Sequence, residues 1–393
     1  MAKAIGSEQL SIDLQPPARS LKSLLTLRLV LGWTVLFGAI VFLLATCWDI
    51  QWHITVGRDR TLTPPHLMIL AGDTISGIAA LAAVLFETLW ARRSPLLAQS
   101  STRFAATFHS SLGAYIAGYA ALTAAISFPL DSYWHSLYGV DVAIWAPFHI
   151  MAIAAMTIAA FGAVFMLMSA ANLASKVHAS RSVQVGYVGV IVALATMMGI
   201  YTIILVQAFG DLSYITLGAV SINVYPLMIA AFGALILVAA VHAIPWRAVA
   251  TSITAVYLFL DLAIYLFVPP AMNALVQIEQ LSFLPAKRGT PPVVLSFQWQ
   301  YTFIIAAVLL DLAIYFARRK GWSPRFHKVV VFTTAMVGFV LVAVLNPLYV
   351  PSVLRHGDPL VILALSLPVG LLGAYVGSSI GLNIGESLRH IER

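Results

Sequence analysis

The sequence is poor in charge and in cysteine. Only 9% of its 393 residues are charged, and it has a single cysteine, Cys47. One cysteine excludes an intramolecular disulfide and any cysteine-based zinc or iron–sulfur site. Soluble domains carry about a quarter charged residues, so the low charge content excludes that class. The sequence also lacks a phosphate-binding glycine loop and a dinucleotide fingerprint, which argues against a nucleotide-dependent enzyme.

Apolar residues are abundant instead. They make up 61% of the chain, and a helix that crosses a membrane needs about 20 of them in succession. Because lipid offers no hydrogen-bond partner to an open backbone, we expect an all-α, polytopic transmembrane helical bundle in the lipid bilayer. The ten expected spans lie near residues 24–47, 66–90, 103–127, 149–173, 183–207, 224–244, 248–268, 299–317, 328–346 and 359–380.

The basic residues predict the orientation of this bundle. The formal net charge is +7, but the lysines and arginines come in small groups between apolar spans, as topology signals do, so no nucleic-acid partner is expected. With both termini in the cytoplasm, most of them fall on the inner side. The outer side then receives only Arg58, Arg60, Lys287, Arg288 and Arg355.

A repeat relates two of the outer segments. Asp49-Ile-Gln-Trp-His53 recurs 82 positions later as Asp131-Ser-Tyr-Trp-His135, and each copy is followed by a glycine and a further aspartate. The repeat predicts that two helix pairs are duplicates of each other. The span after each copy opens with a histidine, namely His66 or His149.

The spacing within each copy suggests metal coordination. An aspartate and a histidine four residues apart share one face of a helix that continues past its apolar run. A returning loop of 12 or 13 residues then brings a second histidine to the head of the next helix. Two imidazoles and one carboxylate suit copper, zinc or iron and leave coordination positions open. The alternative is an interfacial belt of amphipathic side chains. The predicted ligands are Asp49, His53, His66, Asp131, His135 and His149.

Other residues near the repeat are candidates for supporting roles. Asp59 and Asp141 are expected to orient ligand histidines through their second ring nitrogen. Asp73 falls on the same helical face as the second histidine of the first copy, two turns deeper. Cys47 is expected to be a small core residue, and Glu87 is expected to extend to the inner membrane interface.

Both copies resemble the C subunit of the copper membrane monooxygenases, the family of particulate methane and ammonia monooxygenases. The family's first triad has a segment much like R-D-x-x-x-T-P-x-H, and its second triad ends in A-P-L-H. The first triad corresponds here to Asp49, His53 and His66, with Arg58-Asp59 and Thr63-Pro64-Pro65 in the matching places. The second corresponds to Asp131, His135 and His149, with Ala146-Pro147-Phe148 before the last histidine.

The resemblance covers about residues 40–155. Asp131 stands where the family has asparagine, which adds negative charge and bears on the metal that the second triad prefers. The aromatic pair that follows the family's first triad is absent, and six further spans exceed the usual C subunit.

The resemblance implies a copper-dependent monooxygenase subunit in a prokaryotic cell membrane, acting on dioxygen and a small substrate. Companion subunits are implied as well, one of them with a cupredoxin domain, in a homo- or hetero-trimer. Two other functions fit the residues: a non-enzymatic membrane copper-binding or assembly protein, and an ion-coupled transporter.

The second half of the chain has a repeat of its own. Leu-Asp-Leu-Ala-Ile-Tyr occurs with its acid at Asp261 and again at Asp311. A carboxylate inside a span is costly and is a functional candidate, here for a proton path, or else a hydrogen-bond partner of a neighbouring helix. The expected organisation is an N-terminal segment, 1–23, a duplicated metal-binding module, 24–180, and an additional six-span module, 181–393.

Overall fold

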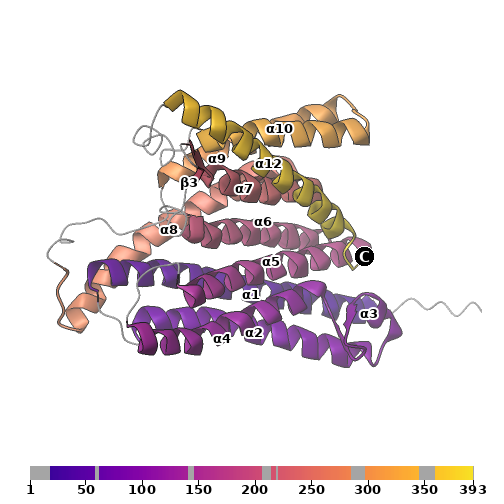
Figure 1. Ribbon diagram of the computed structural model, residues 1–393. Coiled ribbons are helices and arrows are strands. Elements are labelled where there is room, and N and C mark those ends of the chain that lie inside the picture. Colours follow the sequence, from indigo (N-terminus) through magenta and orange to yellow (C-terminus); the bar gives the residue numbers. More distant parts are fainter. Residues whose placement is uncertain are drawn as a thin grey trace, which may run out of the picture.

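The computed structural model describes residues 18–57, 62–139, 146–205, 214–217, 220–284, 297–344 and 359–392, and these are mostly helical (Figure 1). The all-α bundle is thereby confirmed. Its helices are α1 (Ala18–Thr55), α2 (Pro64–Ala91), α3 (Pro95–Gln99), α4 (Leu112–Tyr138), α5 (Pro147–Lys176), α6 (Ser180–Ile203), α7 (Tyr225–Ala243), α8 (Val249–Ile278), α9 (Phe297–Arg319), α10 (Pro324–Val344) and α12 (Pro359–His390). Two short antiparallel hairpins pair β1 (Thr102–Phe104) with β2 (Phe108–Ser110) and β3 (Tyr214–Leu217) with β4 (Val220–Asn223).

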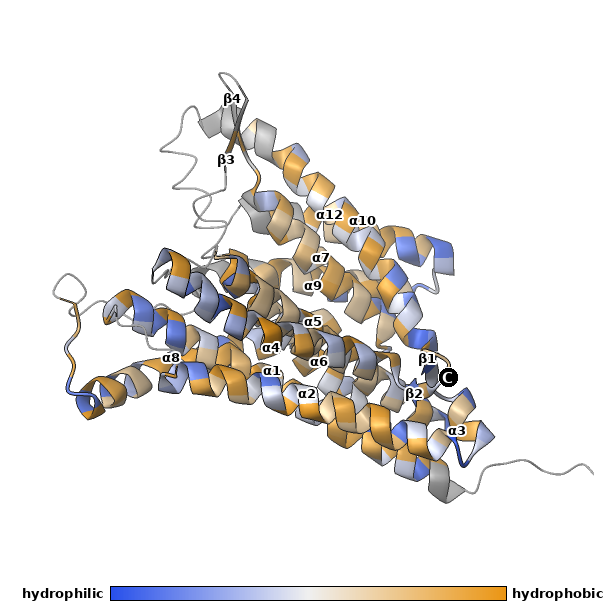
Figure 2. Ribbon diagram, turned by 60° about the horizontal axis from the view of Figure 1, so that its bottom comes forward, coloured by the Kyte–Doolittle hydropathy of each residue, from blue (hydrophilic) through white to orange (hydrophobic). Residues whose placement is uncertain are grey.

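Eight helices in the described part of the chain are long and apolar enough to cross a membrane: α1, α2, α4, α5, α6, α7, α8 and α12. The other two expected spans coincide with α9 and α10, which are helical but fall outside this set. Apolar residues run along the helices, and many of the most hydrophilic residues lie toward the helix ends (Figure 2). Length and composition therefore indicate an integral membrane protein.

Several expected boundaries differ from those in the structure, and two of them have a clear physical reason. The third span was expected from residue 103, but residues 102–110 form the β1–β2 hairpin and α4 begins at Leu112. The hairpin turns at Ala105 and Ala106, whose φ angles of 48° and 60° no helix accommodates. The seventh span was expected to end at 268, but α8 continues through Pro269 and Pro270 to Ile278. Prolines are tolerated inside membrane helices when neighbouring groups satisfy the freed backbone.

Glycines bring the helices of each duplicated pair into close contact. A Cβ atom at Gly72 of α2 would lie 2.7 Å from the Gly38 carbonyl oxygen of α1. A Cβ at Gly162 of α5 would lie 2.8 Å from the Gly113 carbonyl oxygen of α4. Small residues of this kind let membrane helices pack backbone to backbone. The α1–α2 and α4–α5 pairs are therefore held at a separation that larger side chains would not permit.

A longer glycine row joins α12 to α7. Every fourth residue of α12 from Gly373 to Gly385 is a glycine, so the row lies on one helical face. A Cβ at Gly381 would lie 2.8 Å from the Leu235 carbonyl oxygen, and one at Gly385 would lie 2.7 Å from that of Ala239. The row explains how α12 runs alongside α7 in Figure 1.

Helices α6 and α8 pack against α1. Gly199 of α6 lies against Leu43 of α1, and the rings of Trp48 and Phe267 meet edge to face at 5.6 Å. Just beyond α8, the Leu284 amide donates a hydrogen bond of 2.9 Å to the Thr55 carbonyl, at the last residue of α1. The segment after α8 thus contacts the end of the helix that carries the first Asp–His pair.

Candidate metal centre

The first triad is assembled from α1 and α2. Because α1 continues to Thr55, Asp49 and His53 both lie on it, one turn apart. Thr63 is the N-cap of α2, and its hydroxyl accepts a hydrogen bond from the His66 amide at 3.4 Å. Prolines fill the first positions of α2, where a missing N–H costs nothing. The cap and the prolines fix the start of α2 and so place His66 in its first turn.

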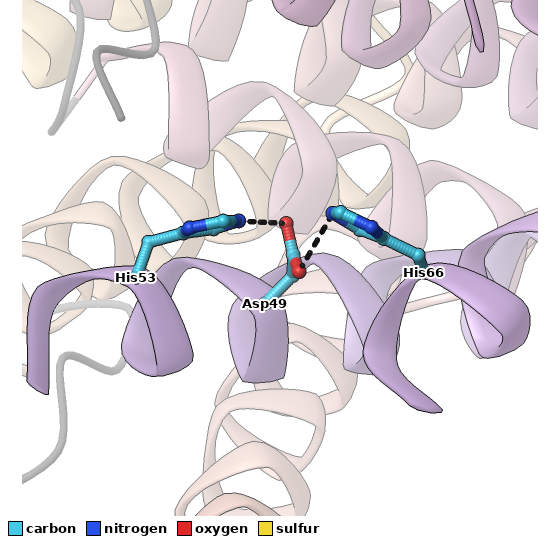
Figure 3. Close-up of side chains that lie close together, drawn as sticks. All are labelled: Asp49, His53 and His66. Atoms are coloured by element: carbon cyan, nitrogen blue, oxygen red, sulfur yellow. Dashed lines mark ion pairs between the residues drawn. The ribbon is translucent and has the colours of Figure 1, made fainter. Parts of the chain in front are cut away.

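Asp49 lies between the two imidazoles of this triad (Figure 3). Its Oδ1 is 3.2 Å from Nε2 of His66, and its Oδ2 is 3.5 Å from Nε2 of His53. The two imidazole rings are 5.7 Å apart between centroids. The three side chains are only 12–16% exposed. Both histidines therefore point the same ring nitrogen at one carboxylate in a largely enclosed site.

The second triad repeats this arrangement on α4 and α5. Oδ2 of Asp131 is 3.2 Å from Nε2 of His135, and Oδ1 is 3.3 Å from Nε2 of His149. The imidazole centroids are 5.9 Å apart. Each atom pairing has its counterpart in the first triad. The duplication expected from the sequence is thus confirmed down to the atoms of the site.

A left-handed glycine ends the Asp–His helix in both copies. Gly57 follows α1 with a φ of 70°, and Gly139 follows α4 with a φ of 83°. Glycine adopts this conformation without the steric cost that a Cβ brings. The carbonyl oxygen of Gly139 lies 3.1 Å from Nδ1 of His135. A proton on Nδ1 donated to that carbonyl leaves the Nε2 lone pair directed at the site, as metal-ligating histidines require.

The geometry of both triads fits a transition-metal ion. Each triad offers three ligand atoms, one per residue, that all lie within 4.8 Å of one another. Metal–nitrogen bonds of about 2.05 Å in a tetrahedral site put neighbouring ligand atoms about 3.3 Å apart. In each triad the two histidines approach different oxygens of one carboxylate, at Nε2–Oδ distances of 3.2–3.5 Å that are close to this spacing. Each triad could therefore hold an ion between its three ligand atoms, and three ligands leave at least one coordination position open.

The surroundings of the two triads differ. Trp52, between the two α1 ligands, is fully buried, and the His66 ring packs edge to face on Phe128 of α4 at 5.7 Å. The corresponding Trp134 is half-buried and packs on Tyr138, which is exposed. Exposure of the ligands rises to 16–27% in the second triad. The first site is thus the more enclosed of the two.

The supporting residues have mixed outcomes. Arg58, Asp59 and Asp141 lie outside the described residues. Asp73 is buried in α2, and its supporting role at the first triad stays a prediction. Cys47 is a buried free cysteine, and its role as a small core residue agrees with the structure.

The two candidate proton-path acids are not brought together. Asp261 is fully buried on α8. Asp311 of α9 accepts hydrogen bonds from the Ala250 and Thr251 amides, at 3.2 and 2.8 Å, and from the Thr251 hydroxyl at 2.7 Å. Asp261 lies ten residues further along α8, which corresponds to about 15 Å. Asp311 therefore caps the start of α8, and Asp261 stands apart from it.

The expectation for Glu87 is wrong. Its side chain is fully buried rather than extended to the interface, and its Oε2 forms an ion pair of 2.7 Å with Nη2 of Arg28 on α1. Glu392 adds a second carboxylate, 3.2 Å from Nη1 of Arg28. The signal for this cluster was Arg28 itself, because an arginine inside an apolar run requires a partner within the bundle.

Comparisons with protein-family models, with curated proteins and with solved structures find no match to this chain. The two triads are therefore the features from which its function is inferred.

Proposed function

We propose that this chain is a subunit of a copper-dependent membrane monooxygenase and holds copper in its two Asp/His/His triads. The observation that supports this most is that one ligand geometry is built twice, from two helix pairs. A chance cluster of interfacial side chains has no reason to repeat the same Nε2–Oδ pairings at the same spacing. The resemblance of both stretches to the C subunit of that family supports the same assignment.

The donor set favours copper among the divalent ions. Imidazole nitrogen with carboxylate oxygen suits copper, zinc and iron, and Cu²⁺ binds most tightly of the first-row divalent ions in sites of this kind. When bound, copper supplies the redox chemistry that activates dioxygen for insertion into a small substrate. The carboxylate of each triad contributes the negative charge that partly balances the ion. The histidines, fixed by their helices, set the geometry.

The place of the triads suits a small substrate. Both lie where α1 and α4 end and where α2 and α5 begin, so they occupy one end of the bundle (Figure 1). Their partial exposure leaves a route for dioxygen and a small molecule. From the distribution of basic residues we assign this end to the extracytoplasmic side. Electrons then come from companion subunits, one of them carrying a cupredoxin domain, in a trimeric assembly like that of the resembled family.

Metal analysis of the purified full chain tests the copper sites. His53→Ala should remove the metal of the first triad, His135→Ala that of the second, and the double variant both. His390→Ala is the matched control, because His390 is an exposed histidine at the C-terminal end of α12 and belongs to neither triad. The spectrum of bound Cu²⁺ should show coupling to imidazole nitrogen. Unchanged copper content in the double variant contradicts the assignment.

Oxygen uptake tests the reaction. Membranes that contain the chain and any subunits that purify with it should consume oxygen when given a quinol or another reductant and a small substrate such as ammonia or a short alkane. His53→Ala and His135→Ala should lower this uptake, and His390→Ala should not. Copper binding without substrate-dependent uptake would instead assign the chain to copper binding or assembly.

A further inference from the structure

A cavity lies at the N-terminal end of α8, away from the two triads. This cavity, of about 640 Å³, opens between the turn that joins α7 to α8 and the C-terminal half of α9. Its position is remote from the first triad, because α8 begins at this cavity and the segment just beyond its far end contacts the end of α1. The 30 residues of α8 span about 45 Å. The cavity is thus a feature separate from the metal sites.

The cavity carries an excess of positive charge. Arg247, Arg318 and Arg319 line it, together with one acid, Asp311, which gives three positive charges against one negative and a net charge of +2. The Asp311 carboxylate accepts hydrogen bonds of 3.2 and 2.8 Å from the Ala250 and Thr251 amides at the start of α8. Among the described residues, none of the three arginines forms an ion pair with a carboxylate. The cavity therefore has the charge to bind an anion.

The arginines are positioned by partners that leave their charge uncompensated. Arg318 donates from Nη1 to the carbonyl oxygens of Pro245 and Trp246, at 2.9 and 3.2 Å. The Arg247 guanidinium lies 6.0 Å from the centre of the Tyr315 ring, within reach of a cation–π contact. Carbonyls and rings fix the direction of these side chains but carry no negative charge. A phosphate group, two oxygens of which can accept parallel hydrogen bonds from one guanidinium, completes such a site.

The remaining wall of the cavity is apolar and faces outward. Val308 and Leu312 of α9 line it and are 40% and 47% exposed, although neither is polar. In a membrane protein, an exposed apolar helix face contacts acyl chains. A basic end joined to such a face matches a lipid with an anionic headgroup better than a free phosphate ion. Basic pockets between membrane helices on the cytoplasmic side bind lipids of this class.

We propose that this cavity binds an anionic phospholipid, with Arg247, Arg318 and Arg319 on the headgroup phosphate and the α9 face along the acyl chains. The lipid then seals the junction of the α7–α8 turn and α9 at the inner membrane surface. This site is independent of the metal triads and of the proposed oxygenase activity.

Lipid binding to the full chain in detergent tests the proposal. The probes are phosphatidylglycerol, phosphatidylcholine and inorganic phosphate, with bound lipid counted by native mass spectrometry. The variant Arg247→Gln/Arg319→Gln leaves the two carbonyl hydrogen bonds of Arg318 in place, so the α7–α8 turn keeps its support. Arg92→Gln/Arg93→Gln is the matched control, because it removes two exposed positive charges from the same side of the bundle.

The wild-type chain should retain phosphatidylglycerol in preference to phosphatidylcholine. Its affinity should fall at least about tenfold in Arg247→Gln/Arg319→Gln and stay unchanged in the control, while Arg247→Lys/Arg319→Lys should recover part of it. Equal binding of both lipids, or unchanged phosphatidylglycerol binding in the glutamine variant, overturns the proposal. Complete competition by millimolar inorganic phosphate would point to a free anion and would also overturn it.

Discussion

Removing Arg28 should destabilise the bundle more than removing any surface charge. Its guanidinium is fully buried and uses every nitrogen: Nε and Nη2 donate to Glu87, Nη1 donates to the Ser169 hydroxyl at 2.7 Å, and Nη2 also donates to the Ser100 carbonyl at 2.8 Å. Glu392 lies 3.2 Å from Nη1. One guanidinium therefore joins α1, α2, α5 and the segment after α3.

The size of the effect follows from the buried charges that remain. Arg28→Met removes the ion-pair partner of the fully buried Glu87 carboxylate. The nearby Glu392 carboxylate, which also pairs with Arg28, then adds electrostatic repulsion. Breaking a buried ion pair by removing one partner costs about 3–5 kcal/mol. In Arg28→Met/Glu87→Leu no unpaired acid remains at position 87. Glu392 keeps its hydrogen bonds from Thr102, Ser169 and the Leu112 amide, so most of the loss should be recovered.

Equilibrium unfolding in mixed detergent micelles measures these free energies. Lys22→Met serves as the control, since Lys22 lies on the same helix but is exposed, and its effect should stay within about 0.5 kcal/mol. The reasoning fails if Arg28→Met costs less than about 1 kcal/mol, or if the double variant is as unstable as the single one. Either result would mean that the cluster is open to water and its charges are screened.

Three further predictions concern the metal, the glycine row and the α8 cap. Copper at 100 times its dissociation constant should raise the free energy of unfolding by about 2.7 kcal/mol for each occupied site, and His53→Ala should remove one such increment in the same titration. Gly377→Ala should cost about 1–3 kcal/mol in that assay, because its Cβ would overlap the Ala231 carbonyl oxygen, whereas Gly118→Ala has ordinary space and should cost less. Asp311→Ala should cost about 0.5–2 kcal/mol through loss of the α8 cap, and a neutral result would show that water replaces the carboxylate there.

The sequence was sufficient to predict the triads because their geometry is local. A spacing of four residues places Asp49 and His53 on one helical face, and the short return to His66 leaves the chain few other paths. The same reasoning applied to the second copy and succeeded there too. A hairpin of two helices is fixed largely by its own residues, so the side chains that it brings together are predictable without the rest of the fold.

The wrong predictions concern features that contacts between distant parts of the chain determine, or that a local pattern leaves ambiguous. Glu87 pairs with an arginine 59 positions away on another helix, so no local pattern could place it. The span expected from residue 103 includes apolar and aromatic side chains that suit a strand as well as a helix, and a hydropathy window does not distinguish them. Local rules predict that a helix ends before Pro269, but α8 continues through it and packs on α1 and α6, which offsets the cost of proline there.

The difference between the two triads also depends on tertiary contacts. The two copies have the same order of ligand residues, and their ligand atoms have the same pairings and nearly the same distances. The first is the more enclosed because α6 and α8 pack against α1, the segment after α8 bonds to Thr55, and Phe128 of the second pair covers His66. Near the end of α4, Tyr133 and Tyr138 are exposed in the part of the chain that the structure describes. Contacts from α6, α8 and α4 therefore make the two sites unequal: the side chains of the first triad are 12–16% exposed and those of the second 16–27%.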